Sequence, residues 1–333
     1  MTIIGDGQMG LASALILAGK GVPVTLWGRD AARVRELSVS RETKRHLPGF
    51  RLPESIHVVS DDSAAFSGAE FIIEAVPTQF IRAVFSRLRP HVPRNLPIVS
   101  QSKGIENDTL LRPTQILSDV LDQNMVGRAL AVMTGPGIAG ELAAGLPSTL
   151  IVAGSDPEFA LRVQEVFTTD RLRIYTKPDL LGIELAGALK NVIALAAGCL
   201  DGLGAGYNAK SALLARGLAE MSRLGVAMGA SADTFFGIAG VGDLATTCFC
   251  PEGRNRWCGE QLGRGRALAE VLASTESIVE GVATTKSVMT LEKKFRVEMP
   301  IAQAVYSVLY EDMAPKTALR TLMTREAKTE RLG

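Results

Sequence analysis

A glycine-rich turn near the N-terminus constrains the fold of this chain more than any other feature. Gly5, Gly7 and Gly10 form a G-x-G-x-x-G pattern between a short apolar run and a helical stretch. The first glycine permits a tight turn, the second lets the backbone approach a pyrophosphate, and the third lets the helix pack on a sheet. The N-terminus of that helix offers N–H groups and the positive end of its dipole. The pattern therefore predicts a dinucleotide-binding turn.

Short runs rich in valine and isoleucine alternate with helical stretches up to about residue 176. Strands are expected at residues 2–4, 23–27, 56–59, 71–75, 96–100, 129–133, 149–153 and 172–175. Helices are expected between them, for example at residues 9–20, 79–88 and 157–167. This alternation predicts an α/β, Rossmann-like, doubly wound domain with a largely parallel sheet.

Four turns of unusual composition follow four of these expected strands. They lie at residues 5–10, 76–78, 102–104 and 135–137, and they include Pro77 and Lys103. In parallel sheets the carboxyl ends of the strands meet at one edge, and ligands bind beyond that edge. The convergence of the four turns is stronger support for a ligand site than any one motif.

The residues after the second expected strand bear on which dinucleotide is bound. A carboxylate at this place binds the ribose 2′-hydroxyl of NAD, whereas an arginine accommodates the 2′-phosphate of NADP. Here Arg29 is followed by Asp30. Arg29 favours NADP and Asp30 leaves NAD possible, while a solvated surface charge is the alternative interpretation of Arg29.

Length and charge narrow the class of protein. The chain has 333 residues, which suits two domains. Its 36 Lys and Arg nearly balance 35 Asp and Glu, so the basic excess of a nucleic-acid-binding protein is lacking. No uninterrupted apolar run approaches the about 20 residues that span a bilayer, and the start does not resemble a signal peptide. We therefore expect a cytoplasmic protein without a membrane or nucleic-acid partner.

The second half reads as packed helices. They are expected at residues 179–200, 209–228, 264–273, 284–294, 301–310 and 316–325. Pro178 disfavours helix in the residue before it and marks the most plausible boundary. The predicted domains are therefore a dinucleotide-binding domain at residues 1–178 and an all-α substrate-binding and catalytic domain at residues 179–333.

The cysteines do not match a metal site. They are Cys199, Cys248, Cys250 and Cys258, with no histidine nearby and no usual zinc spacing. We expect reduced thiols and no metal.

A lysine is the best candidate for proton transfer. The three histidines, His46, His57 and His91, all lie in the first half, away from the ends of the strands. Lys190 interrupts a helical stripe of small apolar residues, and Asn191 follows it. The stem could pack while the ammonium reaches water. However, the helix is apolar nearly all round, which favours burial and a lowered lysine pKa.

Two further segments carry polar groups among glycines. Asp243 lies within a glycine-rich stretch that suggests close backbone approach, and its carboxylate could hold the lysine or a hydroxyl. Arg254 and Asn255 occupy a predicted glycine-containing loop. The planar fork of arginine suits a phosphate, although surface charge explains Arg254 equally well when it is taken alone. Lys103 could supply a second cation.

Together these segments resemble the bacterial NAD(P)-dependent sn-glycerol-3-phosphate dehydrogenases. The matching segments are residues 5–10, 102–104, 135–136, 184–191, 208–210, 216–221, 240–244 and 254–255. The resemblance continues through residues 280–282 to 299–301. It implies reversible reduction of dihydroxyacetone phosphate to glycerol 3-phosphate, which feeds phospholipid synthesis, and it implies a homodimer.

The resemblance also implies roles for individual residues. Lys190 and Asp243 are the expected catalytic pair. Substrate contacts are expected at Lys103, Gly135, Gly137, Asn191, Thr247, Gly253, Arg254 and Asn255. Cofactor contacts are expected at Gly5, Gly7, Gln8, Met9, Gly10, Arg29, Pro77, Lys103, Ala139, Arg254, Ile278 and Glu280. The chain departs from the family at Met9, where an aromatic residue is usual, and at Gly137 and Gly253, where serine is usual.

Two alternatives remain. Another two-domain dehydrogenase with a lysine base, such as a ketopantoate reductase or a β-hydroxyacid dehydrogenase, would act on a carboxylated ketone, which the Arg254-Asn255 pair disfavours. An NADP-binding sensor or inactive paralogue is compatible with the departures at Gly137 and Gly253, but Lys190 and Asp243 count against it.

Overall fold

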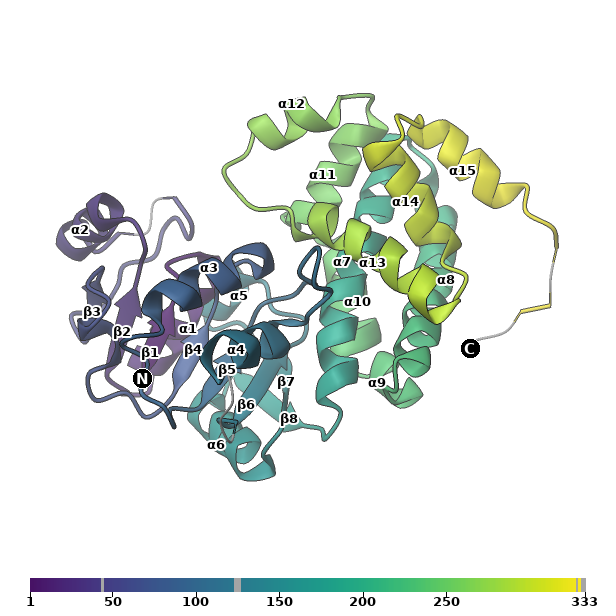
Figure 1. The fold of residues 1–333 in the computed structure, drawn as a ribbon. Helices are drawn as coiled ribbons and strands as arrows, with labels where there is room; N and C mark the ends of the chain where they lie inside the picture. Colours follow the sequence, from purple (N-terminus) through teal and green to yellow (C-terminus); the bar gives the residue numbers. More distant parts are fainter. Residues whose placement is uncertain (43–44, 123–126, 328, 331–333) are drawn as a thin grey trace. The chain divides into compact units, whose positions relative to one another are not determined.

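Residues 1–42, 45–122, 127–327 and 329–330 are described by a computed structural model (Figure 1). The chain divides into two units. Unit 1 comprises Met1–Ser102 and Pro113–Leu180, and unit 2 comprises Lys103–Arg112 and Leu181–Gly333. The unit boundary at Leu180 lies two residues beyond the one expected from sequence. Residues 103–112, which the sequence analysis placed in the first domain, group with unit 2 instead.

Unit 1 contains one eight-stranded sheet in the order β3-β2-β1-β4-β5-β6-β7-β8. The strands are β1 Thr2–Ile4, β2 Val24–Trp27, β3 Ile56–Val59, β4 Ile72–Glu74, β5 Ile98–Ser100, β6 Leu130–Thr134, β7 Ser148–Gly154 and β8 Leu172–Thr176. All neighbours pair in parallel except β6 and β7. The prediction of a Rossmann-like, largely parallel sheet is confirmed, with β7 and β8 running opposite to the rest.

The strands that precede the four unusual turns lie side by side. β1, β4, β5 and β6 are consecutive in the sheet and mutually parallel. Their carboxyl ends therefore meet at one edge, as the sequence indicated.

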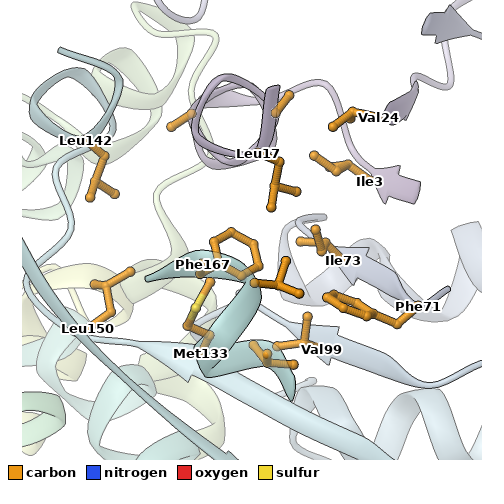
Figure 2. Close-up of a cluster of buried hydrophobic side chains, with 14 of the residues drawn as sticks. Ile3, Leu17, Val24, Phe71, Ile73, Val99, Met133, Leu142, Leu150 and Phe167 are labelled. Atoms are coloured by element: carbon orange, nitrogen blue, oxygen red, sulfur yellow. The ribbon is translucent and has the colours of Figure 1, made fainter. Parts of the chain in front are cut away.

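Helices cover this sheet. They are α1 Gln8–Gly19, α2 Ala31–Ser40, α3 Thr78–Leu88, α4 Pro113–Leu121, α5 Ala139–Ala143 and α6 Pro157–Phe167, with the short 3₁₀ helix η1 at Ala64–Phe66. Ile3, Ile73 and Val99 lie directly beside one another on β1, β4 and β5, so their side chains project to the same side of the sheet. Figure 2 shows them gathered with Leu17 of α1 and Phe167 of α6 in one apolar cluster. α3 and α4 pack against each other in front of the sheet in Figure 1.

The described part of unit 2 consists of helices and their connections, which confirms the all-α expectation. The helices are α7 Leu180–Gly202, α8 Gly206–Ala227, α9 Ala232–Phe235, η2 Ile238–Gly242, α10 Asp243–Phe249, α11 Arg254–Gly263, α12 Leu268–Ala273, α13 Glu280–Phe295, α14 Pro300–Tyr310 and α15 Pro315–Met323. The single helix expected at residues 264–273 is wrong in its first turn. α11 ends at Gly263, and Gly265 has a φ of 90°, which stops a continuous helix.

α7 is a long helix built mostly from apolar residues. By length and composition it could cross a membrane, which the sequence analysis did not anticipate. Most of it is buried inside the structure, from Gly182 to Leu200, so it is the core helix of unit 2.

α7 and α11 touch through their backbones. Glycines stand four residues apart on each helix: Gly198 and Gly202 on α7, and Gly259 and Gly263 on α11. A Cβ atom at Gly198 would lie 1.9 Å from the Arg256 carbonyl oxygen, and one at Gly259 would lie 2.0 Å from the Leu195 carbonyl oxygen. No side chain larger than hydrogen fits at these crossing points, so the glycines fix how closely α11 approaches α7.

We predict that Gly259→Ala destabilises the protein by about 1–3 kcal/mol, because backbone on both helices must shift to admit the methyl group. Gly19→Ala is the control, since no described atom lies within 4 Å of a Cβ atom placed there. It should be neutral or slightly stabilising. Urea unfolding of both variants measures the difference, and an unchanged midpoint for Gly259→Ala would contradict the packing described here.

Candidate functional site

The glycine fingerprint of unit 1 has the geometry that its sequence predicts. Gly5 has a φ of 119°, and a Cβ atom there would lie 2.6 Å from the Ala75 carbonyl oxygen. A Cβ atom at Gly10 would lie 1.9 Å from the Gly5 carbonyl oxygen, so only glycine lets α1 start so close to the turn. At Gly7, by contrast, no described atom lies within 4 Å of an added Cβ. Tight packing at the outer glycines and space at the middle one fit a turn that receives a pyrophosphate.

The start of α1 supports that fit. Gly7 is the N-cap residue, and among the described residues no side chain caps the helix. The first N–H groups of a helix have no partner within the helix, and they favour an anion. Gln8 and Met9 form the first turn of α1.

Asp30 is engaged in holding α2. Its Oδ1 atom accepts hydrogen bonds from the N–H groups of Ala32 (3.0 Å) and Arg33 (3.2 Å). Its Oδ2 atom pairs with Nε of Arg33 at 2.9 Å. The neighbouring Arg29 is exposed. The carboxylate that left NAD possible therefore serves as a helix cap, whereas the guanidinium next to it faces solvent.

The remaining predicted residues of unit 1 lie at the carboxyl ends of its strands or at the helix starts that follow. Pro77 is the N-cap of α3, and Ala139 is the first residue of α5. Gly135 follows β6 directly with a φ of 132°. Gly137 has limited room, because a Cβ atom there would lie 3.2 Å from Cδ2 of Leu150.

The predicted catalytic pair is in direct contact within unit 2. Nζ of Lys190 donates hydrogen bonds to Oδ1 of Asp243 (2.6 Å) and to Oγ1 of Thr247 (2.5 Å). Nζ of Lys103 donates to the other carboxylate oxygen of Asp243 at 2.6 Å. Thr247 lies one helical turn after Asp243 on α10 and donates its hydroxyl proton to the Asp243 carbonyl oxygen at 2.7 Å. One buried carboxylate thus holds two ammonium groups.

Burial determines the proton affinity of this cluster. Lys190 and Asp243 are 5% and 1% exposed, so neither charge is well solvated. Burial, with the nearby Lys103 ammonium acting in the same direction, lowers the pKa of Lys190 to about 8 against the opposing charge of Asp243. Burial also raises the pKa of Asp243, but the two ammonium groups outweigh it and keep that pKa below its ordinary value. The result is an ionised carboxylate beside a lysine that can exchange its proton near neutral pH.

A chain of amide hydrogen bonds joins four segments of unit 2. The N–H group of Gly281 donates to Oδ1 of Asn255 at 2.8 Å. Nδ2 of Asn255 then donates to Oδ1 of Asn191 at 3.0 Å, and Nδ2 of Asn191 donates to the Lys103 carbonyl oxygen at 2.9 Å. The predicted substrate residues Asn191 and Asn255 are therefore structural links between α13, α11, α7 and residues 103–112.

Arg254 and Asn255 open a helix, so the expected loop is wrong at these two positions. They are the first residues of α11, whose N-cap is Gly253. Among the described residues no side chain caps this helix. The exposed Arg254 donates from Nη1 to the Ile278 carbonyl oxygen at 3.2 Å, and Glu280 begins α13 two residues after Ile278. Gly253 has no side-chain hydroxyl, and a Cβ atom there would lie 3.1 Å from the Thr247 carbonyl oxygen.

Sequence reasoning missed an ion pair and a buried serine hydroxyl that contact the segment of residues 103–112. Arg112 pairs with Glu184, whose side chain is fully buried. The Ser287 hydroxyl lies 2.8 Å from Oδ1 of Asn107 and 3.1 Å from the Ile105 carbonyl oxygen. The rule that singled out Lys190, a charge on an apolar helix, would also have found Glu184 on the same helix. No sequence signal points to Ser287.

In unit 1, sequence reasoning missed Glu74 at the end of β4. Its buried carboxylate accepts hydrogen bonds from Ser100 Oγ (2.6 Å) and Ser102 Oγ (2.8 Å). It holds the carboxyl ends of β4 and β5 together, directly before Lys103.

The four cysteines carry free thiols. Across the described ranges, no group of three or more His, Cys, Asp or Glu side chains is placed to hold a metal ion.

Two family models together account for nearly the whole chain. The NAD-dependent glycerol-3-phosphate dehydrogenase N-terminus model matches residues 1–160, and the corresponding C-terminus model matches residues 179–320. The chain belongs to the NAD-dependent glycerol-3-phosphate dehydrogenase family.

Members of this family match the chain over its full length. It is 44% identical over 330 residues to a glycerol-3-phosphate dehydrogenase [NAD(P)+] of Citrifermentans bemidjiense, covering 99% of this chain and 98% of that protein. A second such enzyme, from Geobacter sp. strain M21, is 45% identical with the same coverage. The crystal structure of glycerol-3-phosphate dehydrogenase from Coxiella burnetii superposes with a TM-score of 0.93 at 34% identity, covering 97% of this chain and 98% of that one.

A ketopantoate reductase from Ralstonia eutropha shares the fold more distantly. It has a TM-score of 0.60 and 16% identity, covering 96% of this chain and all of that one. This likeness concerns the fold alone and does not favour the carboxylated-ketone alternative over the family assignment.

We predict that Asp243→Asn destabilises the protein by about 3–5 kcal/mol at pH 6, because the buried Lys190 ammonium and the partly buried Lys103 ammonium lose their counter-charge. The loss should be smaller at pH 10, where Lys190 is neutral. Asp119→Asn is the control, because Asp119 pairs with Arg82 at the surface and should contribute no more than about 1 kcal/mol. Denaturant unfolding at both pH values measures this. An equal effect for both variants would contradict the buried cluster.

Proposed function

We propose that this chain reversibly reduces dihydroxyacetone phosphate to sn-glycerol 3-phosphate with NADPH or NADH, using Lys190 as the acid and base. The observation that carries the proposal is the buried contact of Lys190 with Asp243 and Thr247. Full-length relatives named as glycerol-3-phosphate dehydrogenases support the substrate. The product is a precursor for phospholipid synthesis.

Lys190 suits proton transfer to a developing alkoxide. When bound, the reduced nicotinamide supplies a hydride to the C2 carbonyl carbon of the substrate. The Lys190 ammonium donates the proton that the C2 oxygen then needs. Because Asp243 neutralises only one of the two lysine ammonium groups, the cluster retains one positive charge, which stabilises negative charge on that oxygen.

The start of α11 suits the substrate phosphate. Arg254 presents a guanidinium with five N–H donors, one of which is bonded to Ile278. The uncapped N–H groups of α11 favour an anion at the same place. We infer that Arg254 binds the phosphate, with Lys103 and Thr247 nearer the reacting carbon. Asn191 and Asn255 position these groups through their amide chain.

The fingerprint turn suits the pyrophosphate of the cofactor, with Gly7 and the first turn of α1 providing N–H donors. Arg29 favours the 2′-phosphate of NADP, since Asp30 is committed to α2. We also infer that Pro77 and Ala139 in unit 1, and Ile278 and Glu280 in unit 2, contact the cofactor.

We further propose that the protein is a cytoplasmic homodimer. The family resemblance supports both the location and the dimer. Exposed apolar side chains of unit 2 support the dimer, for example Tyr207 and Met323, which are 81% and 76% exposed. Sedimentation of the purified protein tests the dimer.

The proposal is tested first by following NADPH absorbance with dihydroxyacetone phosphate, with NADH in parallel and with ketopantoate as a carboxylated substrate. Rapid oxidation with the phosphorylated ketone alone is the expected result. Binding of NADPH without oxidation by either ketone would favour the sensor interpretation. Oxidation with ketopantoate alone would favour the other dehydrogenase class.

We predict opposite pH dependences for the two directions. Ketone reduction needs the ammonium form of Lys190, so turnover should fall as the pH rises through about 8. Oxidation of glycerol 3-phosphate needs the neutral amine, so its turnover should rise over the same range.

Lys190→Met should lower turnover about 10²- to 10⁴-fold in both directions, because no other group is proposed to transfer the proton. Near-normal turnover of Lys190→Met, measured under substrate saturation, would exclude Lys190 as the acid.

We predict that Arg29→Ala raises KM for NADPH about tenfold or more, the loss expected for a charge-assisted hydrogen bond, while leaving KM for NADH unchanged. Arg94→Ala is the control. Arg94 is exposed and lies before the amino end of β5, whereas Arg29 follows the carboxyl end of β2. Equal effects of Arg29→Ala on both cofactors would contradict the proposed contact with the 2′-phosphate.

A further inference from the structure

The chain leaves unit 1 for ten residues in the middle of its sheet-forming half. After Ser102 the segment Lys103–Arg112 groups with unit 2, and Pro113 then returns to unit 1 as the start of α4. Lys103 is the first residue of this segment, and its ammonium group donates a hydrogen bond to Asp243. The position of that ammonium therefore depends on what holds the segment to unit 2.

Three contacts hold the segment to three different places on unit 2. At its start, Nδ2 of Asn191 donates to the Lys103 carbonyl oxygen at 2.9 Å. In its middle, the buried Ser287 hydroxyl of α13 lies 2.8 Å from Oδ1 of Asn107. At its end, Arg112 forms an ion pair with the fully buried Glu184 at the start of α7.

The backbone of the segment is itself well defined. Asp108 and Leu110 have φ angles of 63° and 60°, in the left-handed region that is unfavourable for a leucine. Such a conformation persists only where surrounding contacts determine it. Internal hydrogen bonds close the turn: the Leu110 N–H group donates to the Glu106 carbonyl oxygen at 3.1 Å, and the Thr109 hydroxyl donates to Oε2 of Glu106 at 2.5 Å.

We propose that Ser287 and the Arg112–Glu184 ion pair are positioning residues that hold the segment Lys103–Arg112 so that Lys103 meets Asp243. This inference rests on the proposed function, because it assigns these residues to the same reaction. A lysine side chain loses considerable rotamer freedom when its ammonium is fixed at one point. The contacts at Lys103 and Arg112 anchor the segment at both ends and so restrict the movement of its backbone. The Lys103 ammonium is thereby kept next to Lys190.

The proposal has a consequence beyond stability. The Lys103 ammonium contributes to the lowered pKa of Lys190. If the anchors fail and Lys103 moves away, Lys190 should hold its proton to a higher pH. A purely structural role for Ser287 would leave this titration unchanged.

A double-mutant cycle tests the proposal. Ser287→Ala should lower kcat/KM for dihydroxyacetone phosphate about two- to tenfold, the range expected for one lost hydrogen bond, and should move the alkaline limit of ketone reduction to higher pH. In a Lys103→Met background the same change should have no further effect, because the residue being positioned is absent. The matched control is Ser307→Ala, which removes another buried hydroxyl from a helix of unit 2, where it is bonded to Glu311.

A second variant covers the case in which Ser287→Ala folds poorly. Leu110→Gly gives the backbone of the segment more conformational freedom without emptying a fully buried site, so it should shift the pH limit in the same direction. An equal loss from Ser287→Ala in both backgrounds, or an unmoved pH limit in both variants, would overturn the proposal.

The outcomes separate this proposal from the proposed function. If the wild-type protein does not oxidise NADPH with dihydroxyacetone phosphate, the function fails. Titration of Lys190 by NMR in wild type and Ser287→Ala then decides the positioning role, which requires a higher pKa in the variant and is overturned by equal values.

Discussion

The Asp243 carboxylate, shared between the ammonium groups of Lys190 and Lys103, is the interaction on which the proposed chemistry depends. Each participant comes from a different element: Lys190 from α7, Asp243 from α10 and Lys103 from the segment Lys103–Arg112. Burying a charge is unfavourable unless it is paired and hydrogen-bonded. The cluster therefore stabilises the arrangement of these three elements only while all its members are present.

We propose that the two units recognise their ligands by different means. Unit 1 offers mainly backbone groups, at a turn where Gly5 and Gly10 pack tightly and Gly7 leaves space. Unit 2 offers the charged side chains of Lys103, Lys190 and Arg254. The hydrogen bond between Asn191 and Asn255 joins α7 and α11, which carry Lys190 and Arg254. A chain with a formal net charge of only +1 can thus present local positive charge to a phosphorylated substrate.

Much of this could be predicted from sequence, because the relevant signals are local. The fingerprint turn, the strand alternation and the single lysine on an apolar helix each depend on neighbours within one helix or turn. The remaining features depend on contacts between distant residues. The segment Lys103–Arg112 has no composition that separates it from unit 1, and Leu110 adopts a conformation usually signalled by glycine or asparagine. The start of α11 was missed because Gly253 lacks a capping side chain, and the role of Asp30 as a helix cap was missed beside its possible role in cofactor choice.

The most direct test of the central claim is the titration of Lys190 itself, by NMR of protein carrying ¹³C at the lysine ε-carbons. Lys190→Met identifies its resonance by the loss of one signal. We predict that Lys190 titrates near pH 8, far below an ordinary exposed lysine at about 10.4. If every lysine signal titrated above pH 10, Lys190 would not be the poised proton donor described here.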